Sequence, residues 1–294
     1  MFDTRKAGVD MSMQQRQKRL VALTAVLTAH PGQLISLGDL SKQLGAAKST
    51  LSEDLVAVNQ ALEASGAGVI ETTVGALGGV AWRPALDVKR TAACLAAWIE
   101  ALAEPERRTA EGFLYMTDLL FDPERIAPMG QLLADRMRPL GVEAVATVET
   151  KGIPLALATA EHLGVGVVLL RRDSRLSDGS ALSINYLSGS SHRIQSMSLS
   201  RRAPVQGVRV AFVDDFMKAG GTARAAADLL SEFNARVVGV GVLIATDEPQ
   251  VKLAGDYVAC LAWSPARNAI SASPWVEERL RVKRGDERGT SSGA

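Results

Sequence analysis

Short apolar runs alternate with helix-forming segments along the second half of the chain. Runs such as residues 144–149 and 208–213 are almost continuous in Val, Ala and other apolar residues, without the alternation of a strand that has one face in water. Continuous strands of this kind are typical of a parallel sheet that helices cover on both faces. In such a sheet, ligands bind at the carboxyl ends of the strands. The pattern predicts strands over residues 144–149, 165–171, 208–213 and 237–245, and helices over 153–164 and 222–235.

The first ninety residues show helical spacing instead. Residues 14–29 carry an apolar stripe that ends at a Pro-Gly turn, and further helices are predicted over 36–44 and 47–65. Two strands, 68–73 and 79–82, flank a glycine-rich tip. Helix, helix-turn-helix and hairpin in this order indicate a winged helix, although a three-helix module for protein contacts would share most of the pattern.

These patterns predict four segments. We expect a flexible N-terminus over residues 1–13 and a winged-helix domain over 14–86. An apolar helix over 88–103 begins the second domain, which extends over 87–275. Residues 276–294 are charged and end in Gly and Ser, so we expect a disordered tail.

The composition is that of an ordinary globular protein. Its 294 residues are 47% hydrophobic and 22% charged, enough for two domains with separate cores. The net charge of +1 does not by itself indicate a polyanionic partner. Cys94 and Cys260 lack the spacing of a metal or redox site, so we expect small buried residues in a reducing compartment and no metal centre. No apolar run approaches the ~18 residues of a membrane span and there is no signal-peptide core, so we expect a cytoplasmic protein without a membrane partner.

The segment 209–222, RVAFVDDFMKAGGT, carries the clearest chemical signal. A buried strand ends in two carboxylates, Asp214 and Asp215, and a small-residue turn leads into a helix. Carboxylates can accept hydrogen bonds from the hydroxyls of a ribose, while loop amides and a helix N-terminus bind its phosphate. A tight turn between strand and helix would explain the glycines but not the acid pair. The predicted ligand-binding residues here are Asp214, Asp215, Phe216, Lys218, Ala219, Gly220, Gly221 and Thr222.

This segment resembles the 5-phosphoribosyl-1-diphosphate (PRPP) loop of the type I phosphoribosyltransferases. It departs from the enzymes at Ala219, where they carry a hydroxyl residue, and at Lys218. A lysine adds a point charge that favours ground-state binding of a phosphate without helping pyrophosphate to leave. We therefore expect a loop that holds its ligand, with no catalytic residues.

Two further segments fit the same resemblance. Thr150, Lys151 and Gly152 follow a strand and open a helix, where a phosphoribosyltransferase carries its diphosphate loop. Residues 183–200 lie where these enzymes carry an antiparallel flexible loop that closes over the ligand, although the same residues would also suit an ordinary edge hairpin. The candidate contacts in this loop are Tyr186, His192 and Arg193.

The helix from residue 47 is the candidate DNA reader. Its first turns offer short polar and basic side chains that suit phosphates and base edges, namely Lys48, Ser49, Thr50 and Ser52. Glu53 and Asp54 would oppose DNA, and we expect both to point away from it.

Together these segments resemble the purine operon repressors of Gram-positive bacteria, which fuse a winged helix to a phosphoribosyltransferase-like domain. The resemblance covers about residues 14–247 and includes AKSTLSEDL at 47–55, GFLYMTDLL at 112–120, TKGIPLA at 150–156 and DDFMKAGGT at 214–222.

The resemblance implies a dimeric repressor of purine synthesis and transport genes that binds a double-stranded operator. It implies no cofactor, but two effectors: PRPP, with or without magnesium, as inducer and guanosine tetraphosphate as co-repressor. The base of the latter would lie on an aromatic ring, for which Phe113, Tyr115 and Phe216 are candidates. A purine phosphoribosyltransferase with an appended helix-turn-helix and an adaptor that does not bind DNA are the alternatives.

Overall fold

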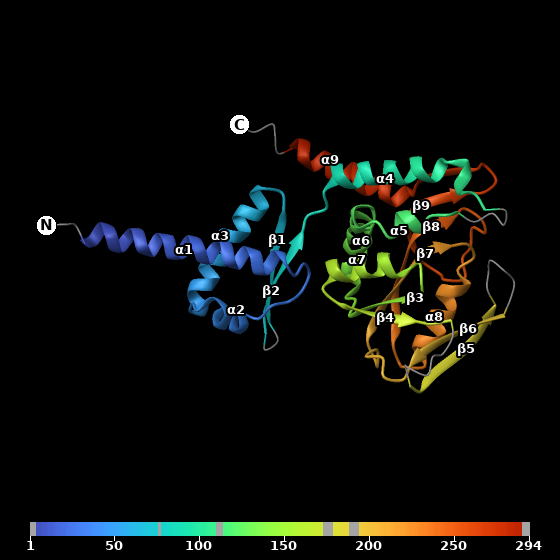
Figure 1. Ribbon diagram of the computed structural model, residues 1–294, viewed down its shortest axis with the longest axis horizontal. Coiled ribbons are helices and arrows are strands. Elements are labelled where there is room, and N and C mark those ends of the chain that lie inside the picture. Colours follow the sequence, from blue (N-terminus) through green and yellow to red (C-terminus); the bar gives the residue numbers. More distant parts are fainter. Residues whose placement is uncertain (1–3, 76–77, 110–113, 173–178, 188–193, 290–294) are drawn as a thin grey trace. The chain divides into compact units, whose positions relative to one another are not determined.

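The computed structural model describes residues 4–75, 78–109, 114–172, 179–187 and 194–289. The chain forms two compact units, Met1–Ala85 and Leu86–Ala294 (Figure 1). This division lies one residue from the expected domain boundary.

The first unit is a three-helix core with a hairpin. Its elements are α1 (Thr4–Thr28), α2 (Leu37–Leu44), α3 (Lys48–Ala64), β1 (Gly68–Thr73) and β2 (Gly79–Pro84). Gly45 has a φ of 61°, which few other residues adopt, and it makes the sharp turn from α2 into α3. Leu23, Leu40 and Leu51, one from each helix, are fully buried in the common core. The hairpin gains a short third strand at Ile35, which pairs with Val80.

The second unit is built on a six-stranded sheet. Its strands are β3 (Ala144–Val148), β4 (Gly166–Leu170), β7 (Arg209–Met217), β8 (Arg236–Thr246), β9 (Val258–Ser264) and β10 (Ala269–Ala272). They lie in the order β10-β9-β8-β7-β3-β4, and every pair is parallel except β10 with β9. The expected parallel sheet is therefore confirmed, with one antiparallel strand added at its edge.

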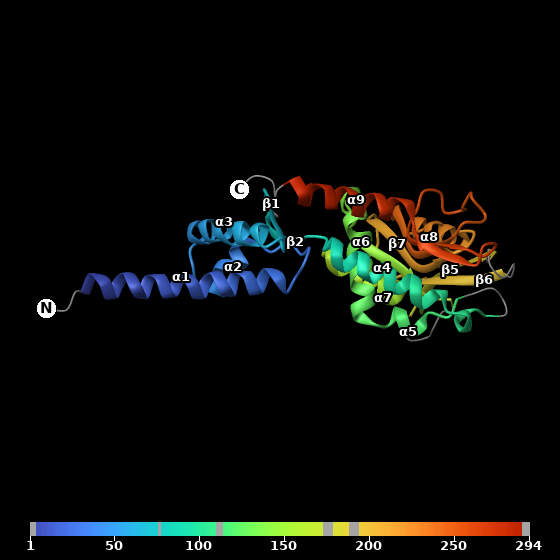
Figure 2. The same cartoon turned by 90° about the horizontal axis from the view of Figure 1, so that it is seen from above.

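Helices cover both faces of this sheet (Figures 1 and 2). One face packs against α6 (Pro123–Met137) and α7 (Ile153–Leu163), together with α4 (Val88–Ala103) and α9 (Pro274–Gly289). The other face packs against α8 (Gly221–Ser231) and the separate hairpin of β5 (Ala181–Leu187) and β6 (Ile194–Ser200). A short helix, α5 (Thr117–Leu120), precedes α6. No helix among the described residues is long and apolar enough to span a membrane.

The strand order reverses between β3 and β7. From β3 the chain passes through α7 to β4 on one side, and from β7 it passes through α8 to β8 on the other. In open sheets of this type, ligands bind outside the carboxyl ends of the two strands at such a reversal. Those ends carry the segments at 150–152 and 214–222, so the topology brings the two predicted loops together.

Both expected disordered ends are helical where the structure describes them. The first helix begins at Thr4 rather than near residue 14, because residues 4–13 include good helix formers and no proline. The tail forms α9, in which Val276 and Leu280 are one helical turn apart and buried. Arg279 of this helix forms an ion pair with Asp135 of α6. The charge of the tail concealed this narrow apolar face.

Candidate functional site

A cleft of about 550 Å³ lies at the reversal of the strand order. The end of β3 supplies Glu149, Thr150 and Lys151, the end of β7 supplies the acid pair and Phe216, and α8 supplies Thr222. The remaining lining residues are Leu114, Met116, Val148 and Arg172. The two loops predicted to bind the sugar phosphate and the diphosphate thus border one cavity.

The two carboxyl groups of the cleft are adjacent and partly buried. Oδ1 of Asp214 accepts a hydrogen bond of 2.9 Å from the backbone N–H of Asp215. Burial raises the pKa of the Asp214 carboxyl, and the charge and the side-chain hydrogen bond of Asp215 raise this pKa further, while the charge of Arg172 acts in the opposite direction. A carboxyl in this position favours hydrogen-bond donors, and ribose hydroxyls are donors of the right kind.

The predicted diphosphate loop, residues 150–152, packs closely against Asp214 at Gly152. A Cβ on Gly152 would lie 2.3 Å from Thr147 Oγ1 and 2.7 Å from Asp214 Oδ1, closer than any side chain permits. The glycine is therefore required by this close approach, since its φ of −70° is one that any residue adopts. The hydroxyl of Thr147 is buried beneath it, with no hydrogen-bond partner among the described residues.

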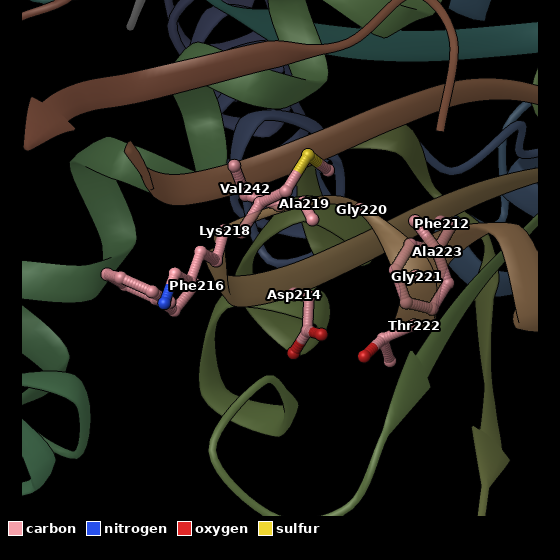
Figure 3. A pocket seen from close by; sticks show the side chains of 11 residues that line it. Phe212, Asp214, Phe216, Lys218, Ala219, Gly220, Gly221, Thr222, Ala223 and Val242 are labelled. Atoms are coloured by element: carbon pink, nitrogen blue, oxygen red, sulfur yellow. The ribbon is translucent and has the colours of Figure 1, made fainter. Parts of the chain in front are cut away.

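The predicted phosphate loop, residues 218–222, turns at Gly220, whose φ of 81° is in the left-handed region, and α8 begins at the next residue. A small hollow of about 60 Å³ lies along Lys218–Thr222. The Asp214 carboxylate and the Thr222 hydroxyl point to the same side of the loop, whereas Lys218 and Phe216 extend away from them (Figure 3). Backbone amides at a helix N-terminus are suited to bind a phosphate.

The aromatic candidates do not share one location. Phe216 lines the cleft. Tyr115 does not, because the segment alternates there: Leu114 and Met116 face the cleft, while the Tyr115 side chain is 52% exposed. Phe113 lies outside the described residues.

The hairpin candidates are also divided. Tyr186 packs on the core of the second unit, and its hydroxyl donates a 2.9 Å hydrogen bond to Gln195 on the paired strand. It is not among the residues that line the cleft. His192 and Arg193 lie outside the described residues.

Sequence reasoning missed Arg172, which brings a positive charge to the cleft. It lies just beyond the carboxyl end of β4, so the available signal was its position after a strand next to β3. Arg171, the residue before it, has its guanidinium 3.7 Å from the Glu149 carboxylate. This ion pair partly compensates the negative charge that Glu149 brings to the cleft.

In the first unit, α3 presents the predicted DNA-contacting side chains in its first turns. Lys48, Ser49 and Ser52 are exposed, and Thr50 is half-buried. The hydroxyl of Ser52 donates a 2.9 Å hydrogen bond to the carbonyl of Lys48. Glu53 is also exposed, and it lies four residues after Ser49 on the same side of the helix.

Asp54, by contrast, is directed into the unit. It is 1% exposed, and its carboxylate pairs with Arg19 at 2.5 Å and with Arg16 at 3.3 Å, both on α1. Asp54 therefore links α3 to α1.

Comparison with known proteins agrees with both units. A family model of the bacterial purine repressor N-terminal region matches residues 15–84, and a model of the phosphoribosyl transferase domain matches residues 126–270. The purine biosynthesis transcriptional repressor of Bacillus subtilis is 42% identical over 250 residues, which cover 85% of this chain and 88% of the relative. The chain belongs to the bacterial purine repressor family.

Other relatives differ in their described roles. The purine biosynthesis transcriptional activator of Lactococcus lactis is 38% identical over 84% of this chain and 91% of the relative. An adenine phosphoribosyltransferase of Kineococcus radiotolerans is 36% identical, over only 45% of this chain and 70% of the enzyme. The chain is thus a DNA-binding transcription regulator of this family with a phosphoribosyltransferase-like second unit, which confirms the family and fold expected from the sequence.

The burial of Asp54 generates a prediction about stability. Asp54→Ala should lower the free energy of unfolding of the first unit by about 2 kcal/mol, because Arg19, whose side chain is 18% exposed, loses a charge-assisted hydrogen bond, whereas the more exposed Arg16 can be solvated. Chemical denaturation monitored by circular dichroism measures this. Glu53→Ala is the matched control, since its exposed neighbouring carboxylate should change stability by less than about 0.5 kcal/mol. Equal effects of the two substitutions would contradict a structural role for Asp54.

Proposed function

We propose that this protein represses purine synthesis and transport genes and that PRPP, bound without turnover in the cleft of the second unit, releases it from DNA. The observation that carries the proposal is the meeting of the acid pair with two anion-binding loops at one cavity. A ligand that joins a ribose to phosphates at both ends would engage all three groups at once.

PRPP matches the cavity group by group. Its 5-phosphate would bind to the amides at Ala219–Thr222 and to the N-terminus of α8. Its ribose hydroxyls would donate to Asp214 and Asp215, and its diphosphate would lie at residues 150–152. Lys151 and Arg172 supply positive charge at that end of the cleft.

Guanosine tetraphosphate is the proposed opposing ligand. It also carries phosphates at two places on a ribose, so it would compete for the same loops. Its base would lie on Phe216, the one of the three aromatic candidates whose side chain lines the cleft among the described residues. We propose that it favours the DNA-bound state.

Repression rather than activation is part of the proposal. The B. subtilis and L. lactis relatives are described as a repressor and an activator at similar identity. A homodimer reading two half-sites is the proposed functional unit, because one winged helix covers only a few base pairs.

The acid pair provides the first test. Asp214→Ala and Asp215→Ala should each weaken PRPP binding about 10- to 150-fold, because each removes a charge-assisted hydrogen bond worth about 1.5–3 kcal/mol. Calorimetric titration of PRPP measures the loss, and operator binding without ligand should be unchanged. Asp228→Ala, on the exposed surface of α8, is the control. Release from DNA at the wild-type PRPP concentration by either cleft variant would refute the assignment.

Linkage between the two sites provides the second test. PRPP and DNA should weaken each other's binding by the same factor, about 5- to 150-fold for a coupling of 1–3 kcal/mol. Titration of PRPP into the free protein and into the DNA-bound protein measures both affinities. Addition of guanosine tetraphosphate should displace PRPP and strengthen DNA binding. Equal PRPP affinities in the two titrations would remove PRPP as the inducer.

The enzyme alternative rests on the phosphoribosyltransferase match and is tested directly. Ala219 in place of a hydroxyl residue and the added Lys218 support ligand binding without turnover. With PRPP, magnesium and adenine, guanine, xanthine or hypoxanthine, we expect no nucleotide product by chromatography. Turnover of any base at an ordinary enzymatic rate would favour the enzyme.

A further inference from the structure

Lys252 is a buried lysine directly behind the phosphate loop. It lies in the connection between β8 and β9 and is 5% exposed, although its neighbours Val251 and Leu253 are 87% and 60% exposed. Apolar side chains are usually buried and lysines exposed, and a lysine is rarely buried unless its charge is satisfied. The segment therefore turns its charge inward and its apolar side chains outward.

The ammonium of Lys252 has three acceptors, which match its three donors. Nζ donates to the carbonyl of Lys218, to the carbonyl of Thr246 at 2.9 Å and to the hydroxyl of Thr246 at 3.2 Å. Within the described residues, no carboxylate lies at ion-pair distance from it. The ammonium is thus held by the backbone of the phosphate loop and by the end of β8, and burial lowers its pKa while the charge of Asp247 raises it.

The same segment contacts the loop at two further points. The backbone N–H of Leu253 donates a 2.8 Å hydrogen bond to the carbonyl of Ala219. A Cβ on Gly220 would lie 2.8 Å from the backbone nitrogen of Ala254, so the loop rests against this segment. Lys218, Ala219 and Gly220 are therefore all held from one side.

Because the peptide bond is planar, these contacts also determine where the N–H groups of the loop point. In a trans peptide, the C=O of one residue and the N–H of the next point in opposite directions. Lys252 holds the carbonyl of Lys218, so the N–H of Ala219 points away from Lys252. Leu253 holds the carbonyl of Ala219, so the N–H of Gly220 points the same way. In the described part of the chain neither N–H has a hydrogen-bond acceptor.

We propose that Lys252 is a positioning residue for phosphate binding: by holding the Lys218 carbonyl it fixes the amides of the loop toward the ligand. The inference rests on the proposed function, because it takes the loop at 218–222 as the site of a sugar phosphate. The ammonium also places a positive charge behind a loop whose front binds an anion.

The test compares Lys252→Met with Val251→Met in the full-length protein. Lys252→Met keeps the chain length and removes the donors, so it should weaken the binding of PRPP and of ribose 5-phosphate equally, by about tenfold or more. Both ligands carry the 5-phosphate that the loop would hold. Val251→Met changes an exposed neighbour without a contact to the loop and should bind both ligands as the wild type does. DNA binding without ligand should be unchanged in both variants.

Amide hydrogen exchange separates positioning from a general loss of stability. With saturating ribose 5-phosphate bound, exchange in Lys252→Met should be faster than in the wild type at residues 218–222, whose amides would hold the phosphate, and unchanged at residues 150–152. If Lys252→Met does not fold, Lys252→Gln takes its place, because its shorter side chain keeps a polar end but cannot supply the three hydrogen bonds of the ammonium. It should weaken ribose 5-phosphate binding about threefold or more, as expected for the loss of at least one hydrogen bond.

Each outcome bears on a single claim. Wild-type affinities and unchanged exchange in the folded variant would overturn the role of Lys252. Failure of the wild-type protein to bind PRPP and ribose 5-phosphate would instead overturn the proposed function. Faster exchange at both loops would show a general loosening and would also overturn the positioning role.

Discussion

The reversal of strand order between β3 and β7 is the constraint on which the ligand site depends. It brings the carboxyl ends of two strands with separate loops to one edge of the sheet, with α7 and α8 on opposite faces. Gly152 then fixes the distance, because its Cα lies against Thr147 and Asp214 with no room for a side chain. The two loops are thus held together where the backbone of Gly152 meets the side chains of Thr147 and Asp214, and the acidic and basic side chains of the cleft are arranged around this contact.

The Asp214 carboxyl of the cleft lies in an environment that is unfavourable for its charge. The pKa of Asp214 is raised by burial and by Asp215, so the empty cleft disfavours the charged form of this carboxyl. A ligand that supplies hydroxyl donors would compensate the buried carboxyl, and Arg172 and Lys151 would compensate its phosphates. A ligand can shift a protein between two states only through a difference in its interactions with them. A buried carboxyl that gains hydrogen-bond donors when a ligand binds can supply such a difference in interaction between the two states.

The elements of this fold follow from local patterns, but their exact extent does not. The strands at 144–149 and 237–245 could be predicted from continuous apolar runs, because both faces of a strand in a covered parallel sheet are buried. The tail was misjudged, because Val276 and Leu280 form a stripe of only two buried residues in a charged segment. Likewise, side chains alternate over residues 114–116, so that Leu114 rather than Tyr115 faces the cleft. The residue types alone do not show which of the two faces of this segment lies toward the cleft.

Charged residues near a functional motif were the hardest to interpret, for a physical reason. Asp54 lies in the helix predicted to contact DNA and Lys252 lies 34 residues from the Lys218 carbonyl that it holds, yet each is buried and satisfied by a distant partner. Asp54 pairs with arginines 35 and 38 residues away, and Lys252 contacts a carbonyl 34 residues away. Burial of a charge requires such partners, and only the fold supplies them. A charge beside a motif can therefore act on the ligand or DNA indirectly, by fixing the backbone that makes the contact.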